Sequence, residues 1–111
     1  MSMTLAFIDI WVNCPDRETA EKIADACIGA KLAACANIFA PIASRYRWKG
    51  AVEMTDEVPL LLKTRAEHFD AVCETVRALH PYEVPSITAT QMCNIDQAYA
   101  DWLRAETREP A

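Results

Sequence analysis

Two extended stretches on either side of Gly50 constrain the fold of this chain of 111 residues more than any other feature. They cover residues 36–48 and 51–64, and in both the side chains alternate in character along the chain. A period of two is typical of β-strands, because successive side chains point to opposite faces of a sheet. The two stretches therefore predict a hairpin whose arms exceed the commonest strand length of about five to six residues.

The register of the predicted hairpin depends on the length of its turn. A two-residue loop at residues 49–50 would place Tyr46 opposite Glu53 and so mix an aromatic face with a charged one. An odd-length loop would keep Tyr46 and Trp48 on the side of Val52. A shift of one residue moves every side chain to the other face, so the choice has only two outcomes. The pattern favours the odd-length loop.

The order of elements along the chain predicts a fold class. The expected elements are a strand over residues 5–12, a helix from Asp16 to about Ala30, the hairpin, a second helix opened by a capping box at residues 64–67 and closed by His80, a strand over 86–92, and a last helix from 94 that carries Tyr99, Trp102 and Leu103. Apolar residues recur at helical spacing in the first helix, at Ala20, Ile23, Ala24, Cys27 and Ile28. In the second helix the residues expected to point inward are Phe69, Val72, Cys73, Val76 and Leu79. The order β-α-β-β-α-β gives an antiparallel sheet with two helices on one face. This predicts a single α+β domain, residues 1–111, with a ferredoxin-like sandwich, a long protruding hairpin and a C-terminal helix.

One face of such a sheet would lack a cover. The chain has too few helices for both faces, and the end of the long hairpin would expose aromatic and aliphatic side chains. We therefore expect another subunit to cover this surface.

Composition narrows the partners and the compartment. The formal net charge is −5, so an acidic surface would repel phosphate, and we expect no nucleic-acid partner. The five cysteines are odd in number and no two lie three apart, which predicts a reduced, cytoplasmic protein rather than a disulfide or zinc framework. The first basic residue is Arg17, and the first apolar stretch is too short to span a membrane, so neither a signal peptide nor membrane binding is expected.

Nothing in the sequence predicts catalysis. No Ser/His/Asp or Cys/His arrangement is visible by spacing, and the two glycines, Gly29 and Gly50, cannot form a phosphate-binding loop. We expect a protein that is not an enzyme.

One group of aromatic and charged side chains could meet at a sheet end or between subunits: Tyr46, Trp48, Lys63, Tyr82 and Glu83. As a pocket, this group would select an anionic or metal-bound small molecule. As an interface, its aromatic residues would be buried anchors, and this interpretation is favoured because aromatic residues are enriched at interfaces. Trp102, on the last helix, is assigned to the core or to the same interface.

The chain resembles the CutA family of divalent cation tolerance proteins. The motifs that carry the resemblance are residues 31–37 (KLAACAN), 46–50 (YRWKG), 57–58 (EV), 62–64 (LKT), 80–85 (HPYEVP) and 99–102 (YADW). The resemblance implies a ferredoxin-like fold, a homotrimer built through long hairpins and sheet edges, and a link to tolerance of copper and other divalent metals. It implies no reaction. An alternative, based on fold analogy alone, is a trimeric small-molecule sensor of the PII signalling type with a ligand cleft between subunits.

The family's proposed copper ligands are incomplete in this chain. The position of the strand cysteine holds Val12, with Cys14 displaced by two residues, and the first position of the histidine pair holds Leu79, so only His80 remains. Thiolate and imidazole suit copper, which makes His80 and Cys14 the candidate metal ligands. We expect no tightly bound cofactor and at most weak binding of copper or another divalent cation. The favoured alternative for His80 is structural, at the end of a helix, while His68 is expected to be solvated.

Two further positions depart from the family pattern. Ser86 stands where a glutamate is common, which removes a carboxylate beside the HPYEVP loop. Pro59 lies inside a predicted strand and cannot donate a hydrogen bond, which predicts a bulge or an unpaired edge there.

Overall fold

The computed structural model describes residues 7–110, so Leu5 and Ala6 of the predicted first strand lie outside the described residues. The elements are β1 (Phe7–Cys14), α1 (Arg17–Gly29), β2 (Cys35–Ile38), β3 (Ile42–Trp48), β4 (Ala51–Arg65), the short 3-10 turn η1 (Ala66–His68), α2 (Phe69–Leu79), β5 (Ile87–Gln91) and α3 (Gln97–Ala105). Their order agrees with the predicted one, and the α+β class is confirmed. None of the described helices is long and apolar enough to cross a membrane.

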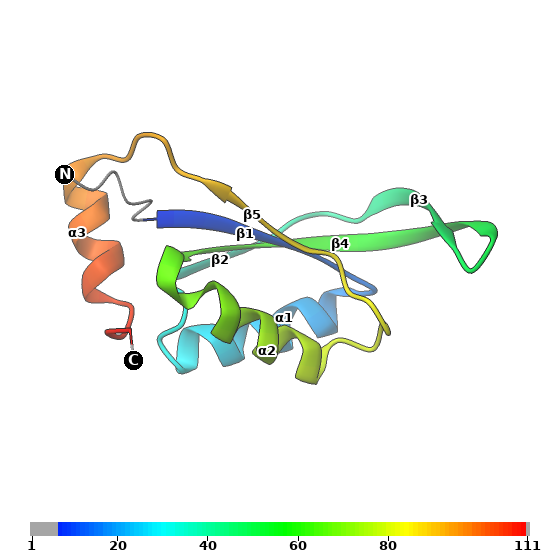
Figure 1. The fold of residues 1–111 in the computed structure, drawn as a ribbon, viewed down its shortest axis with the longest axis horizontal. Helices are drawn as coiled ribbons and strands as arrows, with labels where there is room; N and C mark the ends of the chain where they lie inside the picture. Colours follow the sequence, from blue (N-terminus) through cyan, green and yellow to red (C-terminus); the bar gives the residue numbers. More distant parts are fainter. Residues whose placement is uncertain (1–6, 111) are drawn as a thin grey trace.

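The sheet is antiparallel throughout and has the strand order β2-β4-β1-β5, with β3 continuing the β2 arm along β4. Helices α1 and α2 lie together on one face, and α3 lies at the end of the sheet away from the hairpin (Figure 1). The hairpin of β3 and β4 projects beyond the helices. It lengthens the molecule to 47 × 28 × 26 Å and raises the radius of gyration to 14.8 Å, against about 13 Å for a compact chain of 100 residues.

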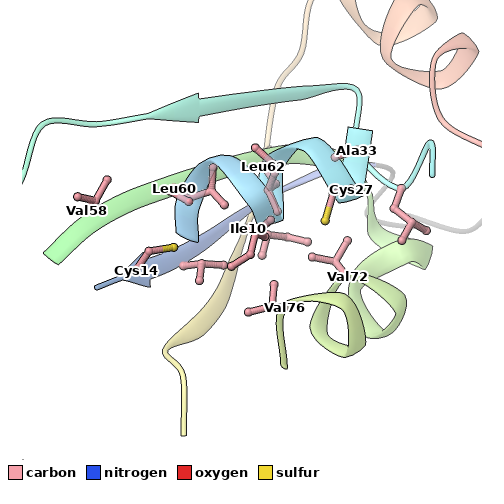
Figure 2. Close-up of a cluster of buried hydrophobic side chains, with 14 of the residues drawn as sticks. Ile10, Cys14, Cys27, Ala33, Val58, Leu60, Leu62, Val72 and Val76 are labelled. Atoms are coloured by element: carbon pink, nitrogen blue, oxygen red, sulfur yellow. The ribbon is translucent and has the colours of Figure 1, made fainter. Parts of the chain in front are cut away.

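The core lies between the sheet and the two helices (Figure 2). Alternate residues of β1 and β4 point into it, among them Ile10 and Leu62, and both are fully buried. From the helices, Cys27 of α1 and Val72 and Val76 of α2 complete the cluster. The predicted helical spacing therefore matches the observed buried stripe, and Cys27 serves as a small apolar residue.

The start of α1 forms as the sequence predicts. Asp16 is the N-cap, and its side chain accepts a hydrogen bond from the backbone N–H of Thr19 at 2.8 Å. Glu18 lies in the first turn, where a negative charge is favoured by the helix dipole.

The prediction of an odd-length hairpin loop is wrong. Tyr46 pairs with Glu53 and Trp48 with Ala51, which leaves the two-residue loop of Lys49 and Gly50. Both loop residues have positive φ angles, 50° and 84°, and two such residues in succession form a turn whose twist matches that of the two strands. The geometry of the turn therefore decides the register, and the mixed face is accepted because this end of the hairpin is exposed.

A bulge in the β2–β3 arm shifts the register before the hairpin narrows to its turn. Ile38 lies opposite Leu60 and Ile42 opposite Glu57, so four steps along one arm match three along the other. The extra residue falls in residues 39–41, opposite Pro59. The bulge predicted from the proline is thus present, but on the facing arm, while Pro59 itself stays paired with β1.

Three local predictions for the second helix are wrong. Thr64 belongs to β4 and donates its hydroxyl hydrogen to the carbonyl of Leu32, so it forms no capping box. His68 is only 3 % exposed, and its Nε2 lies 2.7 Å from the carbonyl oxygen of Arg108. Leu79, expected to point inward, is 41 % exposed, because the buried place at the end of α2 is taken by His80.

A buried arginine, Arg65, ends strand β4 and connects it to the C-terminal part of the chain. Arg65, 3 % exposed, donates to the carbonyls of Arg104 and Thr107 at 2.7 and 2.8 Å, to the Thr107 hydroxyl at 2.7 Å and to the carboxylate of Glu109 at 3.3 Å. Charge-assisted bonds to carbonyls at a helix end satisfy acceptors that would otherwise be unpaired. Arg65 therefore fastens α3 and the C-terminal segment to the end of β4.

Replacing each described glycine by alanine tests the turn. A Cβ at Gly50 or Gly29 would meet no heavy atom within 4 Å, so the two sites differ in backbone conformation alone. We expect Gly50→Ala to lower the free energy of unfolding by roughly 1–2 kcal/mol because of its left-handed φ. Gly29→Ala, at the end of α1, should raise it by about 0.5–1 kcal/mol. Urea denaturation of both variants measures the difference, and equal effects would contradict the assigned turn.

Candidate functional site

A groove of about 830 Å³ lies between the hairpin and the loop that follows α2. Its walls come from β3, from the facing residues of β4 and from residues 82–86 of the loop, with Asn13 at the end of β1. The groove brings together four of the predicted site residues, namely Tyr46, Trp48, Tyr82 and Glu83. The stiff loop between Pro81 and Pro85 thus places its two polar side chains across from the aromatic residues of β3.

Lys63 and Trp102 do not belong to this groove. The Lys63 ammonium lies 5.9 Å from the ring of Tyr99, and that ring stacks on Trp102 with a centroid distance of 5.5 Å. Both residues therefore lie at the α3 end of the sheet. Within one chain Lys63 and Tyr82 do not meet at a sheet end, because β4 is long enough to carry its two ends to separate places.

Contacts near the turn connect the hairpin to the loop. The Lys49 ammonium lies 3.5 Å from a carboxylate oxygen of Glu83 and 5.5 Å from the ring centroid of Trp48. Both partners of the ion pair are largely exposed, so the pair contributes little to stability. The ion pair with Lys49 places the carboxylate of Glu83 at the mouth of the groove rather than inside it.

Glu57 is the charged residue deepest in the groove, and sequence reasoning missed it. It lines the groove yet is only 6 % exposed, and no cationic side chain within residues 7–110 forms a salt bridge with it. One available signal was its place in the chain, directly before the apolar run at 58–62, where β4 passes from exposed to buried. A buried carboxylate without a cation is uncommon in a folded protein.

The carboxylate of Glu57 affects the pKa of two neighbouring side chains, Tyr82 and Cys14. Burial raises the pKa of Tyr82 to about 12, and the charge of Glu57 and a hydrogen bond to it add to that effect. Burial likewise raises the pKa of Cys14 to about 11, with further contributions from the carboxylates of Asp16 and Glu57. The carboxylate of Glu57 therefore disfavours ionisation of both neighbours, in addition to the larger effect of burial.

His80 is held by the backbone through both ring nitrogens. Its Nε2 lies 2.8 Å from the carbonyl oxygen of Asn13, and its Nδ1 accepts the backbone N–H of Tyr82 at 3.2 Å. The ring also packs edge-on against Tyr82, with centroids 4.7 Å apart. A nitrogen engaged in a hydrogen bond cannot also bind a metal, so His80 in this arrangement fixes the start of the loop.

Cys14, the other candidate ligand, is not available to a metal ion either. Cys14 is fully buried in the core, and its raised pKa disfavours the thiolate that binds metals. Within residues 7–110, no three side chains of the types that bind metals are grouped as a metal ion would need. The combination of His80 and Cys14 therefore makes no preformed metal site here.

Comparison with known proteins identifies close relatives. Residues 8–106 match the family model described as CutA1 divalent ion tolerance protein. The chain is 42 % identical over 98 residues to the divalent-cation tolerance protein CutA of Thermus thermophilus, which covers 88 % of this chain and 95 % of that protein. It is 39 % identical over 108 residues to the chloroplastic protein CutA 1 of rice, covering 97 % of this chain but only 61 % of the rice protein.

Solved structures agree with these matches. The crystal structure of CutA1 from rice superposes with a TM-score of 0.90 at 39 % identity, covering 97 % of this chain and 99 % of that one. The structure of the Thermus thermophilus protein gives 0.89 at 40 % identity, over 92 % and 99 %.

The titration of Tyr82 tests the charge at the base of the groove. Replacing Glu57 by Gln removes the negative charge but not the burial, so the pKa of Tyr82 should fall from about 12 only part of the way to its ordinary value near 10. The Cζ chemical shift of labelled tyrosine follows the ring directly. Tyr99 serves as an internal control, because its raised pKa has other causes, chiefly burial and then Cys35. An unchanged Tyr82 curve would contradict the assigned contact.

The same shift predicts how stability depends on pH. Tyr82 ionises near pH 10 in the unfolded chain and near 12 in the folded one. The folded state thus keeps its proton longer, and the contribution of this residue to stability is complete below pH 10 and lost between about 10 and 12. In the Glu57→Gln variant the pKa of Tyr82 in the folded state is lower, so this contribution to stability should be lost over a narrower pH range above 10.

Proposed function

The chain belongs to the CutA1 divalent ion tolerance family, and on that basis we propose that it acts in the tolerance of divalent cations, copper among them. The observation that carries this proposal is the family match over residues 8–106. A bacterial strain deleted for its own CutA protein provides the test. Expression of this chain should restore growth in elevated copper, and the same cells without the chain should remain sensitive. Equal growth of the two would contradict the proposal.

The proposed role is not enzymatic. What supports this is the state of the nucleophiles: the pKa values of Cys14 and Cys27 are raised by burial to about 11, which keeps both thiols protonated and unreactive at neutral pH. His80, which could otherwise act as a base, has both nitrogens bound to the backbone.

We further propose that the protein works in the cytoplasm, without nucleic-acid or membrane partners. All five cysteines are free thiols, which suits a reducing compartment, and the net charge of −5 disfavours phosphate.

We propose that the working unit is a homotrimer. Support comes from the sheet face opposite the helices, where Trp11 and Phe39 pack with ring centroids 5.6 Å apart and Phe39 remains 42 % exposed. The hairpin adds Val52 and Met54, exposed by 59 % and 69 %. A surface of this kind is unusual on a monomer unless a partner covers it.

Dilution tests the trimer. Sedimentation at micromolar concentration should give three times the monomer mass of 12.4 kDa, and the melting temperature should rise with protein concentration, because association stabilises the folded state. Phe39→Asp should shift the equilibrium toward smaller species. Ile28→Asp is the matched control, since Ile28 is similarly exposed, at 39 %, but lies on α1. A monomer in the parent protein would overturn the proposal.

For the metal, we propose weak and loosely organised binding of copper or another divalent cation, with no tightly bound cofactor. The reason is the chain's own chemistry: position 79 is leucine, and His80 and Cys14 are committed to internal packing. A metal bound through Nδ1 of His80 would first have to displace the backbone N–H of Tyr82 from that nitrogen.

Restoring the missing imidazole tests this view. Leu79 is 41 % exposed at the end of α2, so Leu79→His places a second imidazole at a position open to solvent beside His80. Loss of a mere supporting partner can cost metal affinity about 10–100-fold, so an added ligand should raise Cu(II) affinity at least about tenfold in calorimetric titration. Ile28→His is the control for a lone surface histidine. An equal gain in both variants would show that position 79 carries no special site.

A second candidate function is suggested by the groove. We propose, as the alternative, a trimeric sensor of the PII-like kind that binds a small molecule beside the hairpin. The supporting observation is a concave site of about 830 Å³ with aromatic walls and a buried charge, which lies within the size range of ligand pockets.

A further inference from the structure

We propose that the groove binds a small organic cation, an alkylated or aromatic ammonium, with its charge beside Glu57 and its apolar body against Tyr46, Trp48 and Tyr82. This inference rests on the second proposed function and names the class of ligand that the groove would take. It does not depend on the role in metal tolerance.

The first step of the argument is the buried carboxylate. The side chain of Glu57 is only 6 % exposed, and within residues 7–110 it forms no ion pair. The hydroxyl of Tyr82 donates a hydrogen bond to it, but that hydroxyl is neutral and cannot balance a charge. A buried anion that lacks a counter-ion gains more from an incoming cation than an exposed one does.

The second step is the nature of the walls. Tyr46 and Trp48 line the groove from the hairpin and are 38 % and 36 % exposed, and Tyr82 lines it from the loop. Aromatic faces attract cations through their quadrupole, tryptophan most strongly, and several faces around one charge form the arrangement that recognises ammonium ligands. The Lys49 ammonium already lies 5.5 Å from the Trp48 ring, an example of this contact at the rim.

The third step concerns the opposing charges. Arg45 and Arg47 also line the groove, but both are exposed, so water and salt screen them. Lys49 is engaged with Glu83. Among the described residues that line the groove, the buried charge is therefore that of Glu57.

An organic cation suits this site better than a metal ion. Divalent cations need several oxygen, nitrogen or sulfur ligands around one point, and no three acidic, histidine or cysteine side chains of the described residues are grouped in that way. Aromatic walls offer a metal ion no lone pairs, whereas they match the weakly hydrated surface of an alkylated ammonium.

The experiment uses the full chain and three aromatic probes of different charge: benzyltrimethylammonium, its neutral carbon analogue neopentylbenzene, which has the same shape, and the anion benzenesulfonate. Titrations are followed by amide and indole NMR signals of Trp48 and Tyr82. We expect saturable shifts with the cation only, without competition from Mg²⁺. Comparable binding of the neutral or anionic probe, or displacement by Mg²⁺, would overturn the cation class.

Matched variants locate the site. Glu57→Gln should weaken binding of the cation by at least about tenfold, whereas Glu83→Gln, an exposed carboxylate on the same groove, should change it less than about threefold. Trp48→Leu should lose binding, while Trp102→Leu, which removes an exposed tryptophan outside the groove, should keep it.

The outcomes separate the two proposals. If Glu57→Gln does not fold, the three probes on the parent protein still decide the charge preference. Binding of benzenesulfonate at Trp48 would overturn the cation while preserving a ligand function for the groove. If no probe shifts the signals of Trp48 and Tyr82, the inference and the sensor function both fail, and copper tolerance is judged separately by growth.

Discussion

Strand β4 is the element on which the rest of the structure depends. It is 15 residues long and pairs with β1 on one side and with β2 and then β3 on the other. Its second half is buried in the core, whereas its first half projects with β3 beyond the helices. Because one continuous strand serves both regions, the position of every hairpin side chain is determined by the same ladder that holds the core. A register change in β4 would therefore move the core and the groove together.

Much of the fold was predictable because it rests on period and on helix signals. The alternation in β4 and the helical spacing of Ile23, Cys27, Val72 and Val76 each report burial directly, and the structure buries them as expected. The errors arose where two local rules competed. The side-chain faces favoured an odd turn, but two residues in left-handed conformation close the hairpin instead. Sequence shows the faces, yet it does not show that an exposed hairpin end tolerates mixing them.

The sequence predicted the kinds of residue that form the candidate site, but not every residue that lines it. Aromatic and charged residues of the hairpin and the HPYEVP loop do meet, since both flank the same end of β4. Lys63 does not join them, because the strand that carries it is too long for both ends to share one place. Glu57 was overlooked for the opposite reason: a charged residue in an alternating strand is normally assigned to solvent, and its burial depends on Tyr82, which is 25 positions away in the sequence. His68 and Arg65 were hidden in the same way, by a C-terminal segment that folds back over them.

The contrast between His80 and Glu57 explains where this chain can accept a ligand. Both are polar and buried at the root of the hairpin, at 6 % exposure each. His80 has a backbone partner for each ring nitrogen, so an incoming ion would break a hydrogen bond for the one contact that it gained. Glu57 hydrogen-bonds to the neutral hydroxyl of Tyr82 and has no ion-pair partner among the described residues, so a cation adds an interaction without removing one. Burial alone therefore does not distinguish a structural polar residue from a binding one. The distinction lies in whether its hydrogen-bonding and charge requirements are already met inside the fold.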